Sequence, residues 1–264
     1  MNWLMITGGA GFIGRHLKEF FPGAFVVDLR KPADEFLDVR DEVKLRYLVS
    51  HERPSVIIHL AALPGVAALD GLDTQVRGTH AVLRAADDVG ARVVLASSAA
   101  VYSLPEFAET TAWMSEYALG KRLSEQLGEI SPVSFCALRL ANVYGPPWPK
   151  GVVAKFRYAA LVRTTPTITD PSLTRDFVHV DDVVRAFAAA VFSTAQHPMD
   201  ICTGVETSLL ELWRRIAAFH GAPLDYHEGE PRPVDRPSSD TDPSEACETL
   251  QWMSQISLGE GILG

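Results

Sequence analysis

A run of closely spaced glycines near the start of the chain constrains its fold more than any other feature. Gly8, Gly11 and Gly14 follow an apolar run of strand length, residues 3–7, and precede a helix-like segment, residues 15–21. Glycines in such a turn let the backbone approach a pyrophosphate, whose charge then lies at the positive end of the helix. A glycine triplet alone is weak evidence, since tight turns use glycine freely, but strand, turn and helix follow in the required order.

This turn predicts a dinucleotide site. A second apolar run, residues 24–28, ends in Asp28, at the distance expected for a carboxylate that hydrogen-bonds an adenosine ribose. Such a carboxylate favours NAD, because it would repel the additional 2′-phosphate of NADP. Arg30 and Lys31 follow at once and could either reverse that preference or belong to a solvated loop. We therefore expect NAD as the cofactor, with NADP as the alternative.

Strand and helix signals alternate through the first half of the chain. Apolar runs at residues 55–60, 92–96 and 132–140 are typical of buried parallel strands, and residues 79–86 of a helix. This alternation predicts an α/β fold with a doubly wound parallel sheet. Prolines at residues 146–149 break the pattern. We expect residues 1–145 to bind NAD(P) and residues 146–264 to form a smaller substrate-binding lobe, with residues 176–203 packing back on the main sheet.

Composition excludes several classes of protein. The chain has 264 residues, 47% of them hydrophobic, which is too many for disorder, and they are too scattered for a membrane span. The net charge of −9 argues against nucleic-acid binding.

The first strand begins at the third residue and leaves no room for a signal peptide, so we expect a cytoplasmic protein. Three distant cysteines, which we expect to be buried thiols, show no metal-ligand spacing: Cys136, Cys202 and Cys247.

Acid/base chemistry is indicated by a tyrosine and a lysine four residues apart. Tyr117 and Lys121 would lie on one face of a helix, where the cation favours the phenolate. Bringing a tyrosine from a pKa near 10 to neutrality takes roughly 4 kcal/mol, which a lysine and a cationic nicotinamide could supply together. Taken alone, the pair is more often a chance feature of a surface helix. The preceding glycine turn and serine pair, Ser97 and Ser98, favour the catalytic interpretation.

These motifs together resemble the extended short-chain dehydrogenase/reductases, in the NAD-dependent epimerase/dehydratase family that acts mainly on nucleotide sugars. The resemblance covers nearly the whole chain. It is carried by the segments 7–14, 38–41, 59–62, 97–102, 139–146, 175–182, 232–235 and 250–252. The resemblance implies cofactor contacts, shared by Tyr117 and Lys121, from Gly8, Gly11, Phe12, Ile13, Gly14, Asp28, Asp38, Val39, Leu60, Ala61 and Ala62.

The resemblance also implies catalytic roles. Tyr117 would exchange a proton with a sugar hydroxyl, Ser98 would hydrogen-bond the same oxygen, and Lys121 would hold the nicotinamide ribose and lower the pKa of the tyrosine. Substrate contacts would come from Ser98, Asn142, Arg175 and Arg232. Arginine suits a diphosphate because its planar fork makes two charge-assisted bonds. Taken alone, without the resemblance of residues 175–182 to the family, the adjacent Arg175 and Asp176 could form an ordinary ion pair.

Departures from the family pattern narrow the reaction. Ala99 and Ala100 stand where members that eliminate water carry an acidic pair. Alanine transfers no proton, so 4,6-dehydration is disfavoured. Ala100 also stands where the decarboxylases of the family have a glutamate and the 3,5-epimerases a cysteine. A 4-epimerase or a ketoreductase remains. Gln75, in place of the usual asparagine, puts the support of the active-site backbone in mild doubt, and Ser103, in place of the usual glycine, alters a substrate loop.

Two further expectations concern the class of protein and its assembly. A regulator or scaffold that binds cofactor without turnover stays open, although such proteins usually lose the serine, tyrosine or lysine. His59 and His179 lie in apolar runs and are expected to be packed structural residues. The resemblance implies a homodimer through two helices per subunit, residues 74–89 and 115–129, although their apolar positions could equally face the sheet.

Overall fold

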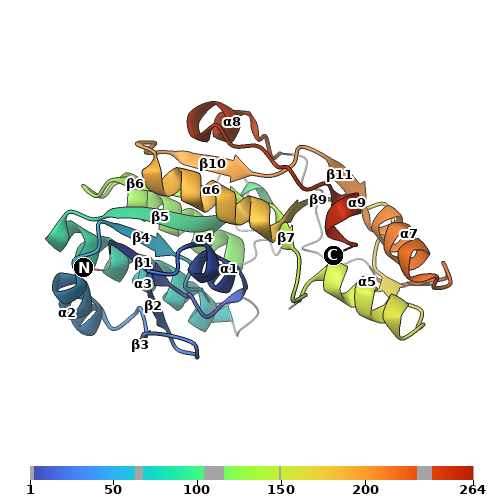
Figure 1. The fold of residues 1–264 in the computed structure, drawn as a ribbon, viewed down its shortest axis with the longest axis horizontal. Helices are drawn as coiled ribbons and strands as arrows, with labels where there is room; N and C mark the ends of the chain where they lie inside the picture. The colour runs from blue at the N-terminus through green and yellow to red at the C-terminus, as the bar shows by residue number, and fades with distance from the viewer. Residues whose placement is uncertain (1–2, 63–67, 104–115, 149, 231–239, 264) are drawn as a thin grey trace.

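Seven parallel strands form the central sheet of the computed structural model, which describes residues 3–62, 68–103, 116–148, 150–230 and 240–263 (Figure 1). The strand order is β10-β6-β5-β4-β1-β2-β3. Their bounds are β1 (Leu4–Thr7), β2 (Phe25–Asp28), β3 (Glu35–Phe36), β4 (Val56–His59), β5 (Arg92–Ser98), β6 (Phe135–Leu140) and β10 (Pro198–Ile201). The direction of winding reverses between β1 and β4, and ligands of such sheets bind at that point.

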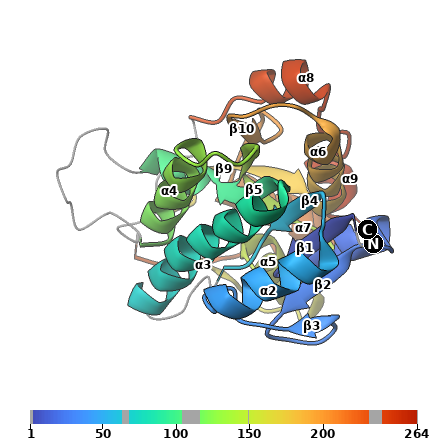
Figure 2. The same ribbon diagram turned by 90° about the vertical axis from the view of Figure 1, so that its left-hand side faces the viewer.

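Helices cover both faces of this sheet. α1 (Phe12–Phe20) and α6 (Val180–Phe192) pack together on one face. α2 (Glu42–Glu52), α3 (Ala68–Val89) and α4 (Glu116–Glu129) lie on the other, with α3 and α4 side by side (Figure 2). Every residue of β1 and β4 is buried between these layers. The two layers confirm the doubly wound α/β fold that the alternating pattern predicts.

Glycines bring α4 close to its neighbours. A Cβ on Gly128 would lie 2.2 Å from the ring of Phe135, the first residue of β6. A Cβ on Gly120 would lie 2.8 Å from Oε1 of Gln75, which is on α3. Ser124 lies between these glycines and donates to the carbonyl oxygens of Gln75 (3.2 Å) and Gly120 (2.8 Å). The helix that carries Tyr117 and Lys121 is therefore fixed against both the sheet and α3.

Most of the second half of the chain builds two small sheets with their own helices. β7 (Asn142–Tyr144), β9 (Thr174–His179) and β11 (Glu206–Ser208) form one sheet, and β8 (Thr167–Ile168) pairs with β12 (His227–Glu228). α5 (Val152–Leu161) and α7 (Leu209–His220) pack together, and Figure 1 shows them at the opposite end of the molecule from α2. A separate apolar core joins these elements, with Phe156 against Trp213 at 5.7 Å between ring centroids.

The chain returns to the main sheet before it ends. β10 pairs with β6, opposite residues 137–140. α8 (Ser244–Leu250) packs on β10, and α9 (Leu258–Gly261) lies against β9. The fully buried carboxylate of Asp182 on α6 accepts hydrogen bonds from the backbone N–H groups of Gln255 (3.0 Å) and Ile256 (3.1 Å). This carboxylate therefore ties the last segment of the chain to α6.

Three local features differ from what the sequence suggests. α1 begins at Phe12, three residues before the expected segment, because the glycine turn itself closes onto the helix. β3 was not expected, since both its residues are exposed and show no apolar pattern. The prediction of three buried thiols is wrong for Cys247, which is exposed on the short helix α8, whereas Cys136 and Cys202 are buried.

In the part of the chain that the structure describes, no helix combines the length and the apolar character needed to cross a bilayer.

Gly128→Ala tests the close contact between α4 and β6. Alanine favours helix, but its methyl group would overlap the ring of Phe135, so we expect a net loss of about 2 kcal/mol in the free energy of unfolding. Urea denaturation followed by circular dichroism measures it. Gly23→Ala is the matched control, because a Cβ there meets nothing within 4 Å. Equal stability of the two variants would contradict the contact.

Candidate active site

The glycine turn holds backbone against backbone where no side chain fits. Gly8 adopts a φ of +74°, and a Cβ there would lie 2.6 Å from the backbone nitrogen of Ala61, just beyond β4. A Cβ on Gly14 would lie 2.5 Å from Cα of Gly9. Gly11 caps α1 without a side-chain hydrogen bond, which leaves first-turn N–H groups of the helix available to an anion. The turn therefore fits a pyrophosphate, as its sequence predicts.

Asp28 ends β2 beside this turn. Its carboxylate accepts hydrogen bonds from the backbone N–H groups of Ala10 and Arg30, each at 3.0 Å. The guanidinium of Arg30 reaches the same carboxylate at 3.5 Å and is largely exposed. Nη2 of Arg30 lies 3.8 Å from where a Cβ on Gly11 would stand. Asp28 thus connects the turn to the following loop and partly neutralises Arg30, the cation that could have favoured NADP.

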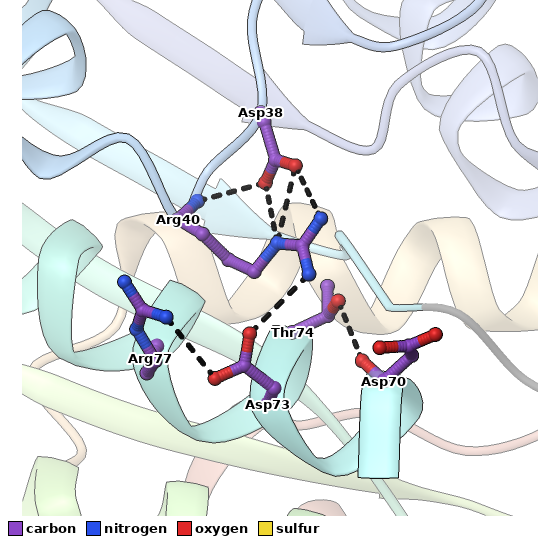
Figure 3. Close-up of polar contacts among 6 residues, drawn as sticks. All are labelled: Asp38, Arg40, Asp70, Asp73, Thr74 and Arg77. Carbon is purple, nitrogen blue, oxygen red and sulfur yellow. Dashed lines mark hydrogen bonds and ion pairs between the residues drawn. The ribbon is translucent and has the colours of Figure 1, made fainter. Parts of the chain in front are cut away.

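A second carboxylate, Asp38, follows β3 at the same edge of the sheet. β3 pairs with the end of β2, Asp28 opposite Phe36, which places Asp38 two residues beyond that pair. Figure 3 shows Arg40 forked across Asp38, with Nη2 at 2.6 Å and Nε at 3.0 Å from its oxygens. This contact holds the pKa of Asp38 below its usual value. The neighbouring Val39 packs where a Cβ on Gly78 would stand.

Arg40 also joins this segment to α3. Its Nη1 lies 3.3 Å from Asp73, and Arg77 reaches the other oxygen of Asp73 at 3.4 Å (Figure 3). Two guanidinium groups and two carboxylates therefore alternate across the gap between the β3 segment and α3. Arg40 fixes the direction in which the remaining lone pairs of Asp38 point.

His59 closes the other side of the turn as a buried structural residue. Its ring nitrogens lie 2.7 Å from Oγ1 of Thr7 and 3.2 Å from Oγ1 of Thr79, and Thr79 donates to Ser124 on α4. Burial and the charge of Lys121 lower the pKa of His59 to about 3, so it is neutral across the physiological range. The structural interpretation of His59 is confirmed. Leu60, Ala61 and Ala62 follow it, at the carboxyl end of β4.

Ser98, Tyr117 and Lys121 come together where β5 ends and α4 begins. Ser98 is the last residue of β5, and its side chain hydrogen-bonds that of Tyr117 in the first turn of α4. Nζ of Lys121 donates to the carbonyl oxygen of Ala96 at 2.5 Å and lies 5.8 Å from the centre of the tyrosine ring. The serine, the phenol and the ammonium are thus neighbours, as the motif predicts.

Burial dominates the electrostatics of this group. It raises the pKa of Tyr117, which the hydrogen bond from Ser98 only partly opposes, and it lowers the pKa of Lys121 to about 8. In the protein alone, the charge of Lys121 does not offset the effect of burial on the phenol, and its ammonium donates to the carbonyl oxygen of Ala96. That Lys121 and a cationic nicotinamide together lower the pKa of Tyr117 stays a prediction. A phenolate at this position needs further positive charge.

Asn142 and Arg175 lie on the small sheet beside the main one. Asn142 begins β7 opposite Phe177 of β9, and its Nδ2 donates to the carbonyl oxygen of Asp176 at 3.2 Å. Arg175 precedes Phe177 by two residues, so their side chains share a face of the strand. The carboxylate of Asp176 accepts from the backbone N–H groups of Thr203 and Gly204. Arg232 lies outside the described residues.

A buried carboxylate near Lys121 was not expected from the sequence. Glu125 is fully buried on α4, four residues after Lys121, and Arg139 of β6 binds it with two nitrogens. The four-residue spacing after the lysine was the available signal, but a glutamate on a helix is usually a solvated residue.

This arrangement defines a dinucleotide-binding α/β enzyme with a serine, a tyrosine and a lysine at the carboxyl edge of its sheet. The model of the NAD dependent epimerase/dehydratase family matches residues 4–202. The chain belongs to this family and is an NAD-dependent enzyme.

Relatives of known activity match over nearly their whole length. A UDP-glucose 4-epimerase of Mycolicibacterium smegmatis is 35% identical over 98% of this chain and 95% of its own. A dTDP-L-rhamnose 4-epimerase of Burkholderia thailandensis is 30% identical, covering 98% and 92%. The first alignment runs over 298 positions, more than the 264 residues of this chain, so that relative carries insertions that this chain lacks.

Solved structures confirm the fold. A UDP-glucose 4-epimerase of Thermotoga maritima, solved with UDP-glucose, superposes with a TM-score of 0.87 at 27% identity, covering 98% of this chain and 96% of its own. The UDP-glucose 4-epimerase of Thermus thermophilus in complex with NAD gives a TM-score of 0.84 at 27% identity, with the same coverage.

Arg40→Met tests whether the bridge in Figure 3 serves the cofactor. Without the guanidinium, Asp38 loses its fixed orientation, and we expect NAD affinity to fall about fivefold to tenfold. Isothermal titration calorimetry measures the change. Arg77→Met is the matched control, since Arg77 contacts Asp73, whereas Arg40 contacts both Asp73 and Asp38. If both variants bound NAD like the wild type, the bridge would have no part in cofactor binding.

Proposed function

We propose that this chain is a nucleotide-sugar 4-epimerase. The observation that carries the proposal is the hydrogen bond between Ser98 and Tyr117, with Tyr117 one helical turn from Lys121 on α4. Similarity to two 4-epimerases over almost the whole chain supports it. NAD held at the glycine turn would supply an acceptor for the hydride of the sugar carbon, and its reduced form would return that hydride to the opposite face of the sugar.

The residues of this chain handle the proton and the position of the sugar. Tyr117 removes the proton of the sugar hydroxyl as the keto form arises, and returns it afterwards. Ser98 hydrogen-bonds the same oxygen and orients it toward the phenol. Lys121, together with the charge of the oxidised nicotinamide, stabilises the phenolate that burial disfavours. A bound oxidised nicotinamide would add the positive charge that favours proton removal by Tyr117.

The residues after Ser98 argue against elimination. Ala99 and Ala100 form the start of the short helix η1 (Ala99–Ser103) and are half-buried. Neither side chain can donate or accept a proton where a dehydratase or decarboxylase of this family would need one. Chemistry limited to one sugar carbon is therefore favoured.

A ketoreductase of a nucleotide-linked keto sugar is the second candidate. A dTDP-4-dehydro-6-deoxy-D-allose reductase of Streptomyces bikiniensis is 28% identical over 96% of this chain. A reductase releases its oxidised cofactor after each turnover, whereas an epimerase recycles it. Asp28 pairs with Arg30, the cation that could have attracted the 2′-phosphate of NADP. This pairing favours NAD and therefore the epimerase.

Two measurements test the proposal. The denatured protein is analysed for released nucleotide, and proton NMR follows UDP-glucose, UDP-galactose and dTDP-linked 6-deoxysugars. Retained NAD with interconversion of two 4-epimers is the expected result. An empty site that prefers NADPH, with consumption of a 4-keto sugar, would establish the reductase instead. Binding of NAD without turnover of any nucleotide sugar would favour a regulator or scaffold.

Tyr117→Phe tests the proton carrier. The phenyl ring keeps the packing of α4 but transfers no proton, so we expect turnover to fall about 10²-fold to 10⁴-fold. NAD affinity should change less than twofold, because the fold of the turn is untouched. Coupled turnover and calorimetry measure the two quantities. Wild-type turnover in this variant would assign the proton transfer elsewhere.

Arg175→Ala tests diphosphate binding on the small sheet. We expect the affinity for UDP to fall about tenfold to hundredfold, since a charge-assisted pair of bonds is lost, while NAD affinity stays constant. Arg214→Ala, an exposed arginine of α7, provides the control for the loss of one positive charge. Unchanged UDP affinity in Arg175→Ala would place the diphosphate on other residues.

The division of labour within the chain follows from the same proposal. Residues 1–145 would hold the cofactor, and residues 146–264 the nucleotide sugar, apart from β10, which is a strand of the main sheet, and α6, which covers one face of it. A homodimer through α3 and α4 is also proposed. The two helices lie side by side (Figure 2). Leu119, Leu123 and Leu127 are half-buried along α4.

A further inference from the structure

A fully buried carboxylate stands one helical turn beyond the catalytic lysine. Glu125 has a relative exposure of 0%, and Lys121, four residues earlier on α4, has 4%. Residues at this spacing lie on the same face of a helix. The ammonium donates to the carbonyl oxygen of Ala96, so Glu125 acts on it through space rather than through that hydrogen bond.

Three groups hold the carboxylate in place. Arg139 of β6 binds it in a fork, with Nε 3.0 Å from Oε1 and Nη2 2.7 Å from Oε2. The hydroxyl of Ser97 donates to Oε1 in a short hydrogen bond, and Arg122 on α4 lies 3.8 Å from Oε2. Ser97 immediately precedes Ser98 on β5. The carboxylate is therefore connected to the same strand end that positions the catalytic serine.

The guanidinium of Arg139 is itself part of a longer chain of contacts. Its Nη1 donates to the hydroxyl of Tyr102 at 3.0 Å, and that hydroxyl donates to the carboxylate of Asp200 on β10, 2.9 Å from both oxygens. Asp200 also accepts from the backbone N–H of Asp242 at 3.0 Å. The single positive charge of Arg139 is thus shared between two carboxylates, Glu125 directly and Asp200 through the hydroxyl of Tyr102.

Stability alone is a weak reason to bury the ion pair of Glu125 and Arg139. Burying two opposite charges costs about as much as their attraction returns, and well-packed apolar residues often serve a fold as well or better. The site beside Lys121, in contrast, has a specific need for an anion, because burial favours loss of the lysine's proton.

The other groups around Lys121 do not supply that anion. His59 on β4 is neutral, and Tyr117 on α4 is a neutral phenol before the reaction. β5 contributes the Ala96 carbonyl and the hydroxyls of Ser97 and Ser98, and α3 contributes the uncharged Gln75 and Thr79. Arg139 on β6 and Arg122 on α4 are cations. Among the described residues that face Lys121 from these elements, Glu125 is the anion.

We propose that Glu125 is the positioning residue that keeps the buried Lys121 charged, with Arg139 and Ser97 holding its carboxylate in place. The catalytic meaning of this arrangement rests on the proposed function, in which the ammonium stabilises the phenolate of Tyr117. The charge state of Lys121 can be measured without any substrate.

The experiment is a pH titration of Lys121 by NMR in the NAD complex labelled with ¹³C-lysine. The resonance missing from Lys121→Met identifies Lys121. We expect its midpoint to move down by roughly one pH unit or more in Glu125→Gln, because the amide keeps the shape and removes the charge. Glu129→Gln is the matched control: it removes the same charge one turn later, where the side chain is exposed.

A second variant guards against a misfolded protein. Glu125→Gln with Arg139→Met leaves no unpaired guanidinium in the core, and it should also lower the midpoint of Lys121. An unchanged midpoint in whichever of these two variants folds would overturn the proposal and assign Glu125 a structural role alone.

Turnover gives an independent comparison. Once a substrate is identified, the loss of activity at alkaline pH should shift to lower pH by the same amount in Glu125→Gln and stay at its wild-type position in Glu129→Gln. A shifted NMR midpoint without any sugar turnover would refute the epimerase and leave the counter-ion assignment intact.

Discussion

The close approach of backbone to backbone at the glycine turn underlies the rest of the structure. Gly9 and Gly14 allow α1 to start directly on the turn, and Gly8 brings that turn against Ala61 at the end of β4. Because β1 and β4 are neighbours at the reversal of strand order, this contact lies where ligands of such sheets bind. A single Cβ at Gly8 or Gly14 would push the two strand ends or the helix apart.

The same principle places α4, the helix that carries Tyr117 and Lys121. Gly120 and Gly128 let α4 approach α3 and β6 closely enough to bury Lys121 and Glu125. Burial then changes the chemistry, since it raises the pKa of Tyr117 and lowers that of Lys121. Tyr117 is therefore a neutral phenol in the protein alone, and additional positive charge beside it would favour the phenolate.

Much of the site was readable from local pattern, and the exceptions have physical reasons. The turn, Asp28 and the Tyr117–Lys121 pair follow from short spacings, because a strand end, a helix start and one helical turn impose them. Glu125 escaped because its partner Arg139 is 14 residues away and on a strand. Cys247 was expected to be buried but lies on the exposed side of α8. The roles of Asn142 and Arg175 stay predictions, and the segment with Arg232 lies outside the described residues.

The sequence by itself determined the class of fold, the glycine turn and the placing of Tyr117 and Lys121 one helical turn apart, because each depends on residues within one or two elements. Tertiary structure decided which charges are buried and which oppose one another. The Glu125–Arg139 pair, the bridge from Asp38 through Arg40 to Asp73, and the fork of Tyr102 on Asp200 all join elements distant in the chain. Electrostatic energies depend on distance and burial in space, and no spacing along a sequence encodes those quantities.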